Sequence, residues 1–434
     1  MPLIKNPLTI VQQGGGGSTS DDVRFIDYDG TIIAQMSTEE AIALTELPAG
    51  PTHAGLTFDG WTHTLSQVQA GHILDVGALY VSSKNADETV FEIQPTAGQQ
   101  ISFTFTQDTA NGVSVDWGDG SAAETYSDVG ASITASHTYS ATSASPLYIR
   151  VLPSSGASIT AISVPSTIFG LVIIGKAPLP SSLTVTTKII VTKKCTSTAF
   201  SLGSSSVKCV IIPDTFTSIS QNGFTSDRGL EVLVIPETIT ALPARAISQC
   251  YSLDRLVLPE SITSIAVGSS SALLQPYGLK TIYYGCAISP IPSDPARGSF
   301  LSQCYGLKKF EISRNLSGLA LSSSLFLNTY SLHSLTIPKN VTELSSAFLG
   351  STNAMKEIIF EDRANMPTMY TGTFQYHLNP LVLDFTKCTQ IPTFDNGWSG
   401  ADVTGITIKV PANLETAWKA ASGWSAYAAN IVGA

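Results

Sequence analysis

The feature that most constrains this chain is a repeated apolar pattern that fills its C-terminal two thirds. The pattern reads L-x-x-L-x-I-P-x-x-I-T-x-I, and its clearest copies start at Leu230, Leu253 and Leu332. Degenerate copies start near Val207, Leu279, Leu307, Met355, Leu378 and Val403. The starts lie 23 to 28 residues apart. A repeat this short cannot bury its apolar face alone, so neighbouring copies are expected to stack around a shared core.

Each copy is expected to form short strands with inward-facing Leu and Ile side chains. The proline that follows ends the pairing, because it has no amide proton to donate. A period in the twenties with regularly spaced leucines is typical of leucine-rich repeat solenoids. The consensus also resembles the BspA-type repeats of bacterial and phage surface proteins. We therefore predict a solenoid over residues 153–410, with weaker copies near Ile159 and Leu183 capping its N-terminal end.

Residues 411–434 are predicted to close the other end of the solenoid as a helical cap. Leu414 and Trp418 lie four residues apart and therefore share one face of a short amphipathic helix. Together with Trp424 and Ile431, they can cover the last open repeat, and stacked arrays require such a cap.

Residues 1–21 combine an apolar peptide with a flexible linker. Gly14 to Gly17 and the Ser-Thr-Ser that follows are typical of a flexible linker. An apolar peptide ahead of such a linker suggests an anchor that docks on another protein, with a disordered tail as the alternative. The candidate anchor residues are Leu3, Ile4, Leu8, Ile10 and Val11.

Residues 22–94 are predicted to form a small α+β module. Residues 23–28 alternate as a strand and lead into an Asp-Gly hairpin signal. Ser37 and Glu40 make a capping box at the start of a short helix, because each side chain can bond the other residue's backbone amide. A second short helix is expected near residues 65–70, and residues 90–93 are expected to close the module.

Residues 95–152 are predicted to form an Ig-like β-sandwich, because several short segments alternate between apolar and polar residues. The run Val115-Asp116-Trp117-Gly118-Asp119-Gly120, followed by His137-Thr138-Tyr139, resembles the PKD (polycystic kidney disease) domain. That resemblance implies a spacer or binding module. The aspartates could bind calcium. A structural role is the preferred interpretation, with Asp119 bonding backbone amides of its turn.

One column of the repeats carries an unexpected residue type. Two positions before the first Leu of seven repeats, the chain has Tyr251, Tyr277, Tyr305, Tyr330, Tyr376, Arg228 and Asn353. Stacked repeats lie about 5 Å apart, so these rings should form a ladder. Tyr offers an apolar face and a hydroxyl, which suits a sugar or a protein partner. Three interpretations stay open: a purely structural ladder, contact with a glycan or receptor, and contact between subunits.

Composition excludes several partners. The formal charge is −10, whereas phosphate binding requires clustered Lys and Arg, so no nucleic-acid partner is expected. The sequence has no run of about 18 apolar residues, so no membrane insertion is expected. Its first residues do not resemble a secretory signal. Charged residues make up only 13% of the chain, against about 25% in typical domains. The many turns of a solenoid account for this, because they favour small hydroxyl residues.

Chemistry-bearing motifs are missing from the sequence. The six cysteines form no C-x-x-C pair, so no metal site is expected, and we interpret them as buried thiols. They are Cys195, Cys209, Cys250, Cys286, Cys304 and Cys388. No G-x-S-x-G, Walker or H-E-x-x-H motif occurs, so we predict that the chain is not an enzyme and needs no cofactor.

The fold class expected from these segments is mainly β, with an α+β module, an Ig-like sandwich, a solenoid and a helical cap. The apolar leader, the glycine hinge and the C-terminal repeats fit a bacteriophage fibre protein. Residues 22–93 also resemble the N-terminal modules of phage fibre proteins, through Asp27-Tyr28-Asp29-Gly30-Thr31 and Gly55 to Trp61. This resemblance implies a tail, baseplate or head fibre in the virion, held to other virion proteins by the N-terminus. The solenoid would bind a host-surface or mucosal glycan or protein, and the chain would form a homo-oligomer, by analogy a trimer. The alternative is a bacterial BspA-like surface adhesin.

Overall fold

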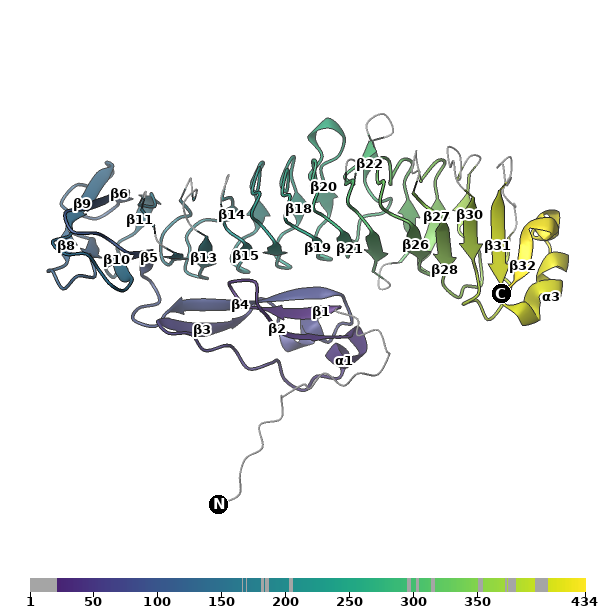
Figure 1. The fold of residues 1–434 in the computed structure, drawn as a ribbon, viewed down its shortest axis with the longest axis horizontal. Coiled ribbons are helices and arrows are strands. Elements are labelled where there is room, and N and C mark those ends of the chain that lie inside the picture. The colour runs from purple at the N-terminus through teal and green to yellow at the C-terminus, as the bar shows by residue number, and fades with distance from the viewer. Residues whose placement is uncertain are drawn as a thin grey trace, which may run out of the picture.

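A computed structural model describes residues 22–434, except for twelve short gaps. The gaps are 166, 169, 181–186 apart from 183, 203–205, 295–297, 302–303, 314–316, 350–353, 371–379 apart from 373, and 395–404. The molecule is mainly β and elongated. A β-sandwich lies at one end, a helical cap lies at the other, and an N-terminal module lies alongside the solenoid between them (Figure 1).

Parallel strands stacked in one long row form the first face of the solenoid. Within each sheet of the row, neighbouring strands pair in parallel register, as Leu256 pairs with Ile282 and Ile282 pairs with Phe310. The row comprises β12 (Leu171–Ile174), β13 (Lys188–Val191), β15 (Cys209–Ile211), β17 (Val232–Val234), β19 (Arg255–Leu258), β21 (Thr281–Tyr284), β24 (Lys309–Ile312), β26 (Ser334–Ile337), β28 (Glu357–Phe360), β30 (Leu381–Asp384), β31 (Ile406–Val410) and β32 (Ile431–Gly433).

A second row of shorter parallel strands faces the first. Its strands are β14 (Ala199–Phe200), β16 (Ser218–Ile219), β18 (Ala241–Leu242), β20 (Ser264–Ile265), β25 (Leu319–Leu321), β27 (Val341–Leu344) and β29 (Thr368–Met369). A hairpin of β22 (Ser293–Asp294) and β23 (Gly298–Ser299) and the 3₁₀ turn η1 (Gly268–Ser270) project between repeats. The repeat leucines and isoleucines fill the narrow space between the rows. The predicted solenoid is therefore confirmed.

Two facing sheets at the N-terminal end form the sandwich. One contains β5, β7, β8 and β10 and continues into β12 and β13, and the other contains β6, β9 and β11. The bounds are β5 (Thr89–Ile93), β6 (Gln100–Gln107), β7 (Val113–Asp116), β8 (Glu124–Thr125), β9 (Ile133–Thr138), β10 (Leu147–Pro153) and β11 (Ile159–Ile162). Phe103, Trp117 and Ile149 belong to one hydrophobic cluster that runs on through the solenoid to Ile431.

Two strands differ from the sequence-based assignment. Residues 90–93 do not close the N-terminal module, because β5 pairs with β10 and β12 of the sandwich. Ile159 does not begin a solenoid repeat, because β11 runs antiparallel to β6. The N-terminal end of the solenoid is therefore covered by the sandwich sheet itself, and β12 is the first strand with a parallel repeat neighbour.

The N-terminal module contains a four-stranded sheet in the order β2-β1-β4-β3 and two short helices. Its elements are β1 (Val23–Ile26), β2 (Ile32–Met36), α1 (Thr38–Ile42), β3 (Leu56–Trp61), α2 (Leu65–Val68) and β4 (Leu74–Ser82). The predicted capping box is confirmed, since Ser37 Oγ accepts the Glu40 amide and the Glu40 carboxylate accepts the Ser37 amide. The predicted hairpin and second helix are also present.

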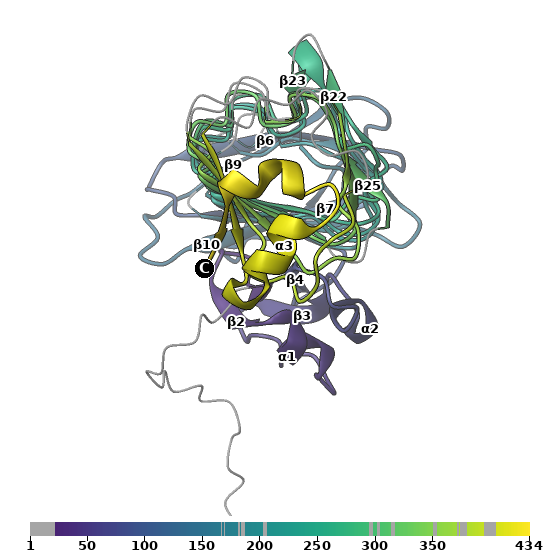
Figure 2. The same ribbon diagram turned by 90° about the vertical axis from the view of Figure 1, so that its right-hand side faces the viewer.

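The module packs through β4 against the first row of the solenoid, as the two views show (Figures 1 and 2). Ile26 and Leu79 form a small apolar cluster with Cys209, Ile211 and Val234. Gly77 permits the close approach, because a Cβ there would lie 2.3 Å from the Ile211 side chain. The module therefore covers one stretch of the first row.

Ion pairs at this interface involve a buried carboxylate. Asp75 accepts two hydrogen bonds of 2.8 Å from Arg24 in the module, and its Oδ1 lies 3.2 Å from Nε of Arg255 in the solenoid. Arg255 also donates to the Asp22 carbonyl at 3.1 Å. His72 of the module lies 3.0 Å from Glu260 of the solenoid. Charge pairing therefore accompanies the apolar contact.

The predicted cap closes the C-terminal end. It consists of η2 (Ala412–Leu414), α3 (Glu415–Ala420), η3 (Ser425–Asn430) and the last strand, β32. Trp418 and Trp424 are fully buried, and their rings lie 5.6 and 5.3 Å from the Phe385 ring. The cap covers the end of the core as expected from the sequence (Figure 2).

Candidate functional site

Four tyrosines of the predicted column form a ladder of stacked rings. Tyr251, Tyr277, Tyr305 and Tyr330 lie in the turns that precede β19, β21, β24 and β26. Successive ring centroids are 5.4 Å apart at each of the three steps, with interplanar angles of 11° to 17°. The spacing agrees with the stacking distance of the strands, so the repeat register positions the rings. We call these four residues the Tyr ladder.

Glycines beside the Tyr ladder allow neighbouring turns to lie this close. A Cβ at Gly278 would lie 1.8 Å from the Tyr251 carbonyl oxygen, and one at Gly306 would lie 2.6 Å from the Tyr277 carbonyl oxygen. Only glycine fits such an approach of two backbones. Each of these two glycines directly follows a ladder tyrosine, and serine takes the same place after Tyr251 and Tyr330.

Part of every ring in the Tyr ladder remains accessible beside its stacked neighbours. The exposed fractions are 41% for Tyr277 and 49% for Tyr330, and the other two residues are half-buried. These values include the docked N-terminal module, which therefore leaves the rings accessible. The result is an apolar strip of aromatic surface bordered by phenolic hydroxyls.

A cation continues the strip at one end. The Arg228 guanidinium carbon lies 5.6 Å from the Tyr251 ring centroid, within the range of a cation–π interaction. At the other end, the Tyr330 hydroxyl donates to Asn328 at 2.8 Å. Burial against the neighbouring rings raises the pKa of the Tyr305 hydroxyl. The Tyr305 hydroxyl is therefore neutral at physiological pH and can donate a hydrogen bond.

Some of the predicted site residues lie outside the described residues. These are Tyr376 and Asn353 of the column and the candidate anchor residues Leu3, Ile4, Leu8, Ile10 and Val11. Of the seven column residues, the structure therefore brings together five, in the order Arg228, Tyr251, Tyr277, Tyr305 and Tyr330.

The Asp119–His137 pair in the sandwich has a structural role. Asp119 accepts the Ser121 amide at 3.0 Å and lies 2.8 Å from the His137 ring nitrogen. These hydrogen bonds lower the pKa of Asp119 to about 2. His137 stacks on the buried Trp117 ring at 5.2 Å. The prediction that Asp119 binds a backbone amide in its turn is confirmed.

The six cysteines are buried free thiols, as predicted. Cys250 Sγ lies 3.0 Å from the Phe224 carbonyl oxygen, which accepts its hydrogen bond. Burial raises the pKa of Cys304, and it raises that of Cys388 to about 11. A thiol held protonated is a poor nucleophile. Among the described residues, no group of three His, Cys, Asp or Glu side chains could hold a metal ion, and no helix could span a membrane.

Tyr148, on the outer face of the sandwich, is an accessible tyrosine outside the Tyr ladder that was not among the candidate site residues predicted from the sequence. Tyr148 is 40% exposed and belongs to β10, where the buried residues Ile149 and Val151 alternate with Tyr148 and Arg150. The alternation in the sequence was a sufficient signal that Tyr148 faces outward.

The stacked parallel strands and their buried leucines define the central region as a leucine-rich repeat solenoid. A family model described as BspA type Leucine rich repeat region matches residues 179–294 and 296–393, in six copies. These residues therefore form BspA-type leucine-rich repeats, and the predicted repeat type is confirmed.

Two matches from a comparison with solved structures have low similarity. A leucine-rich repeat protein from Bacteroides ovatus has 15% identity and a TM-score of 0.24, with 58% of this chain and 84% of that chain covered. The pneumococcal vaccine antigen PcpA has 12% identity and a TM-score of 0.27, with coverage of 65% and 84%. At these values neither structure supports a functional inference. No curated protein matches the sequence.

Proposed function

We propose that this protein is an adhesin-like surface protein whose solenoid binds a glycan or protein through the Tyr ladder. The observation that carries the proposal is the regular, accessible stack of Tyr251, Tyr277, Tyr305 and Tyr330. Aromatic rings with polar edges are favoured at recognition surfaces, because they contribute contact area and hydrogen bonds at a low entropic cost.

The repeat architecture supports a binding role over a catalytic one. The Tyr ladder presents the same side chain at a spacing of 5.4 Å, which suits a ligand with several equivalent contacts. Such contacts add up along a chain-like ligand, so weak single contacts give a useful total affinity. The described strip holds no carboxylate pair or nucleophile, and we therefore propose a binding protein without a cofactor.

Binding of the labelled protein to a glycan array and to intact bacteria tests this proposal. A variant with Tyr251→Ala, Tyr277→Ala and Tyr305→Ala should lose at least tenfold in binding. Tyr370→Ala is the matched control, because Tyr370 is 48% exposed on the solenoid but lies outside the Tyr ladder. Unchanged binding by a folded triple variant would leave the ladder with a structural role only.

More specifically, we propose that the protein is a tail, baseplate or head fibre of a phage virion. The N-terminal apolar residues would attach it to other virion proteins, and the solenoid would extend outward to the host surface. A homo-oligomer, by analogy a trimer, would multiply the weak contacts of each solenoid. This form is supported by the apolar peptide and glycine linker that precede the folded module.

The BspA-type repeats favour a second candidate, a surface adhesin of a bacterial cell. Gold-labelled antibody against the solenoid separates the two in electron micrographs. Label on intact virions supports the phage fibre. Label confined to the bacterial surface would contradict it and support the bacterial adhesin.

A further inference from the structure

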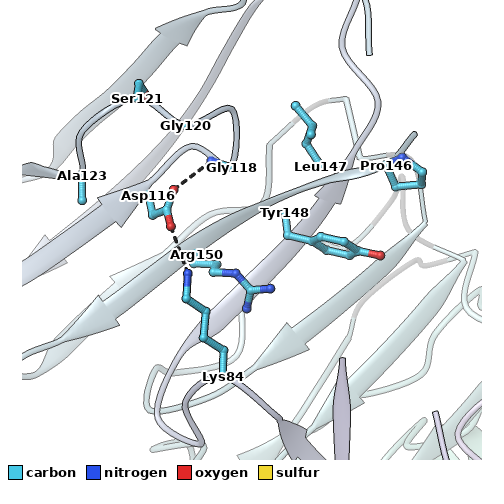
Figure 3. A pocket seen from close by; sticks show the side chains of 10 residues that line it. All are labelled: Lys84, Asp116, Gly118, Gly120, Ser121, Ala123, Pro146, Leu147, Tyr148 and Arg150. Atoms are coloured by element: carbon cyan, nitrogen blue, oxygen red, sulfur yellow. Dashed lines mark hydrogen bonds and ion pairs between the residues drawn. The ribbon is translucent and has the colours of Figure 1, made fainter. Parts of the chain in front are cut away.

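The sandwich carries an open pocket on its outer sheet face, far along the sequence from the Tyr ladder. The pocket has a volume of about 520 Å³. It is lined by Lys84, Asp116, Gly118, Gly120, Ser121, Ala123, Pro146, Leu147, Tyr148 and Arg150. Figure 3 shows these residues around the opening, with Tyr148 and Arg150 extending from β10, Lys84 from the segment after β4, and Gly118 and Gly120 in the facing turn.

Strand register builds this pocket. Tyr148 and Arg150 lie two residues apart in β10 and therefore share the outward face, while Ile149 and Val151 enter the core. In the antiparallel partner β7, Asp116 lies opposite Arg150. Lys84 comes from the segment between β4 and β5, and its Nζ lies 3.3 Å from the Asp116 carboxylate.

The pocket combines an aromatic surface with both donors and acceptors. The Tyr148 ring is 40% exposed, and the Arg150 guanidinium carbon lies 5.7 Å from its centroid. Asp116 accepts the Gly118 amide through one oxygen, and its other oxygen faces Lys84. The Lys84–Asp116 pair is exposed and therefore weak, so a ligand hydroxyl can replace either partner at little cost.

Charge at the pocket favours a neutral ligand. Arg150 pairs with the buried Glu88 behind the pocket, and Lys84 pairs with Asp116, so two cations and two carboxylates cancel. Glu92, opposite Tyr148 in β5, adds a further carboxylate. An anionic ligand would therefore meet no net attraction.

We propose that this pocket binds a neutral pyranose sugar of a glycan, independently of the Tyr ladder. The apolar face of the sugar ring would pack on Tyr148. Adjacent hydroxyls would donate to Asp116 and accept from Lys84 and Ser121, whose side chains supply both hydrogen-bonding types. The preference for a neutral over an anionic sugar follows because both cations are paired with carboxylates and Glu92 adds a further negative charge.

Titration of the full chain against an array of neutral oligosaccharides and their sialylated or sulfated counterparts tests the proposal. The wild type should bind neutral oligosaccharides preferentially. Tyr148→Ala and Asp116→Ala should each weaken that binding at least tenfold, whereas Tyr148→Phe should retain most of it. Thr134→Ala is the control, because Thr134 is exposed on the opposite sheet.

Two binding results would overturn the proposed sugar site. One is a preference for acidic oligosaccharides, and the other is equal binding by the wild type and a folded Tyr148→Ala variant. The triple Tyr ladder variant separates the two sites. If it abolishes binding of neutral oligosaccharides and Tyr148→Ala does not, the ladder is the only sugar site and the pocket binds none.

Discussion

Tyr277 occupies the middle of the Tyr ladder and contacts a ring on each side. Its centroid lies 5.4 Å from those of Tyr251 and Tyr305, whereas Tyr330 has one described ring neighbour, at 5.4 Å from Tyr305. A stacked pair contributes about 0.5–1.5 kcal/mol beyond the area it buries. We therefore expect Tyr277→Ala to lower the free energy of unfolding by about 1–3 kcal/mol and Tyr330→Ala by about half as much. Chemical denaturation measures both values, and equal losses would contradict a stacked ladder.

His63 makes the stability of the molecule depend on pH. It is buried, its Nδ1 lies 3.0 Å from the Thr62 hydroxyl, and its Nε2 has no hydrogen-bond partner among the described atoms. Burial lowers the pKa of His63 from 6.5 to about 4. Between these values the unfolded chain binds more protons than the folded chain, so stability is full above pH 6.5 and falls as the pH approaches 4.

The lowered pKa of His63 corresponds to a loss of at most about 3 kcal/mol in the free energy of unfolding at low pH. A His63→Gln variant, which cannot take up this proton, should lose less stability than the wild type between pH 6.5 and 4. Denaturation curves at pH 7, 5.5 and 4 measure the difference. Parallel loss in both proteins would show that other groups dominate in this range.

The column of tyrosines could be read from the sequence because the repeat period alone brings equivalent positions together. The pairing of Asp75 with Arg255 could not, because 180 residues separate the two and no local pattern relates them. The pocket near Tyr148 could not be predicted for the same reason, because its residues come from distant segments of the sequence. The sequence shows that Tyr148 faces outward, but only strand pairing places Asp116 and Lys84 beside it.

Among the elements, the cap converts an open repeat array into a closed core. Trp418 is fully buried, and its ring lies 5.4 Å from that of Trp424. Replacing a buried tryptophan with alanine costs about 3–5 kcal/mol, because the cavity is only partly filled by relaxation. We expect Trp418→Ala to cost this much, and the control Val432→Ala, whose side chain is 42% exposed, to cost little.

The loss should also be local, because each repeat contacts only its neighbours. Hydrogen exchange should therefore accelerate in β30 and β31 of the Trp418→Ala variant and remain unchanged in the sandwich strands β6 and β9. Uniform acceleration along the chain would indicate one cooperative unit instead.

Strand type was predictable for β5 and β11, but strand partners were not. Alternation identifies a half-buried strand without indicating which neighbour it joins. Val90 of β5 pairs with Arg150, 60 residues later, and with Ile173 of the first solenoid strand. These long-range pairings join the sandwich and solenoid into one sheet, which a boundary between residues 152 and 153 does not suggest.

The whole molecule presents two candidate recognition surfaces on one elongated body. The N-terminal module covers part of the first strand row and leaves the Tyr ladder accessible. A continuous core from the sandwich to the cap fixes the ladder and the pocket near Tyr148 on one body. Such an arrangement suits a surface protein that contacts an extended ligand at more than one point.

Chemical protection of the ladder tyrosines by a bound ligand tests the central claim most directly. N-acetylimidazole acetylates accessible tyrosine hydroxyls, and mass spectrometry measures the extent at Tyr277, Tyr330 and the control Tyr370. All three are between 41% and 49% exposed, so they should react similarly in the free protein. With purified mucin bound, we predict protection of Tyr277 and Tyr330 by at least threefold and none of Tyr370. Binding of mucin with all three tyrosines equally reactive would contradict the Tyr ladder as the recognition surface.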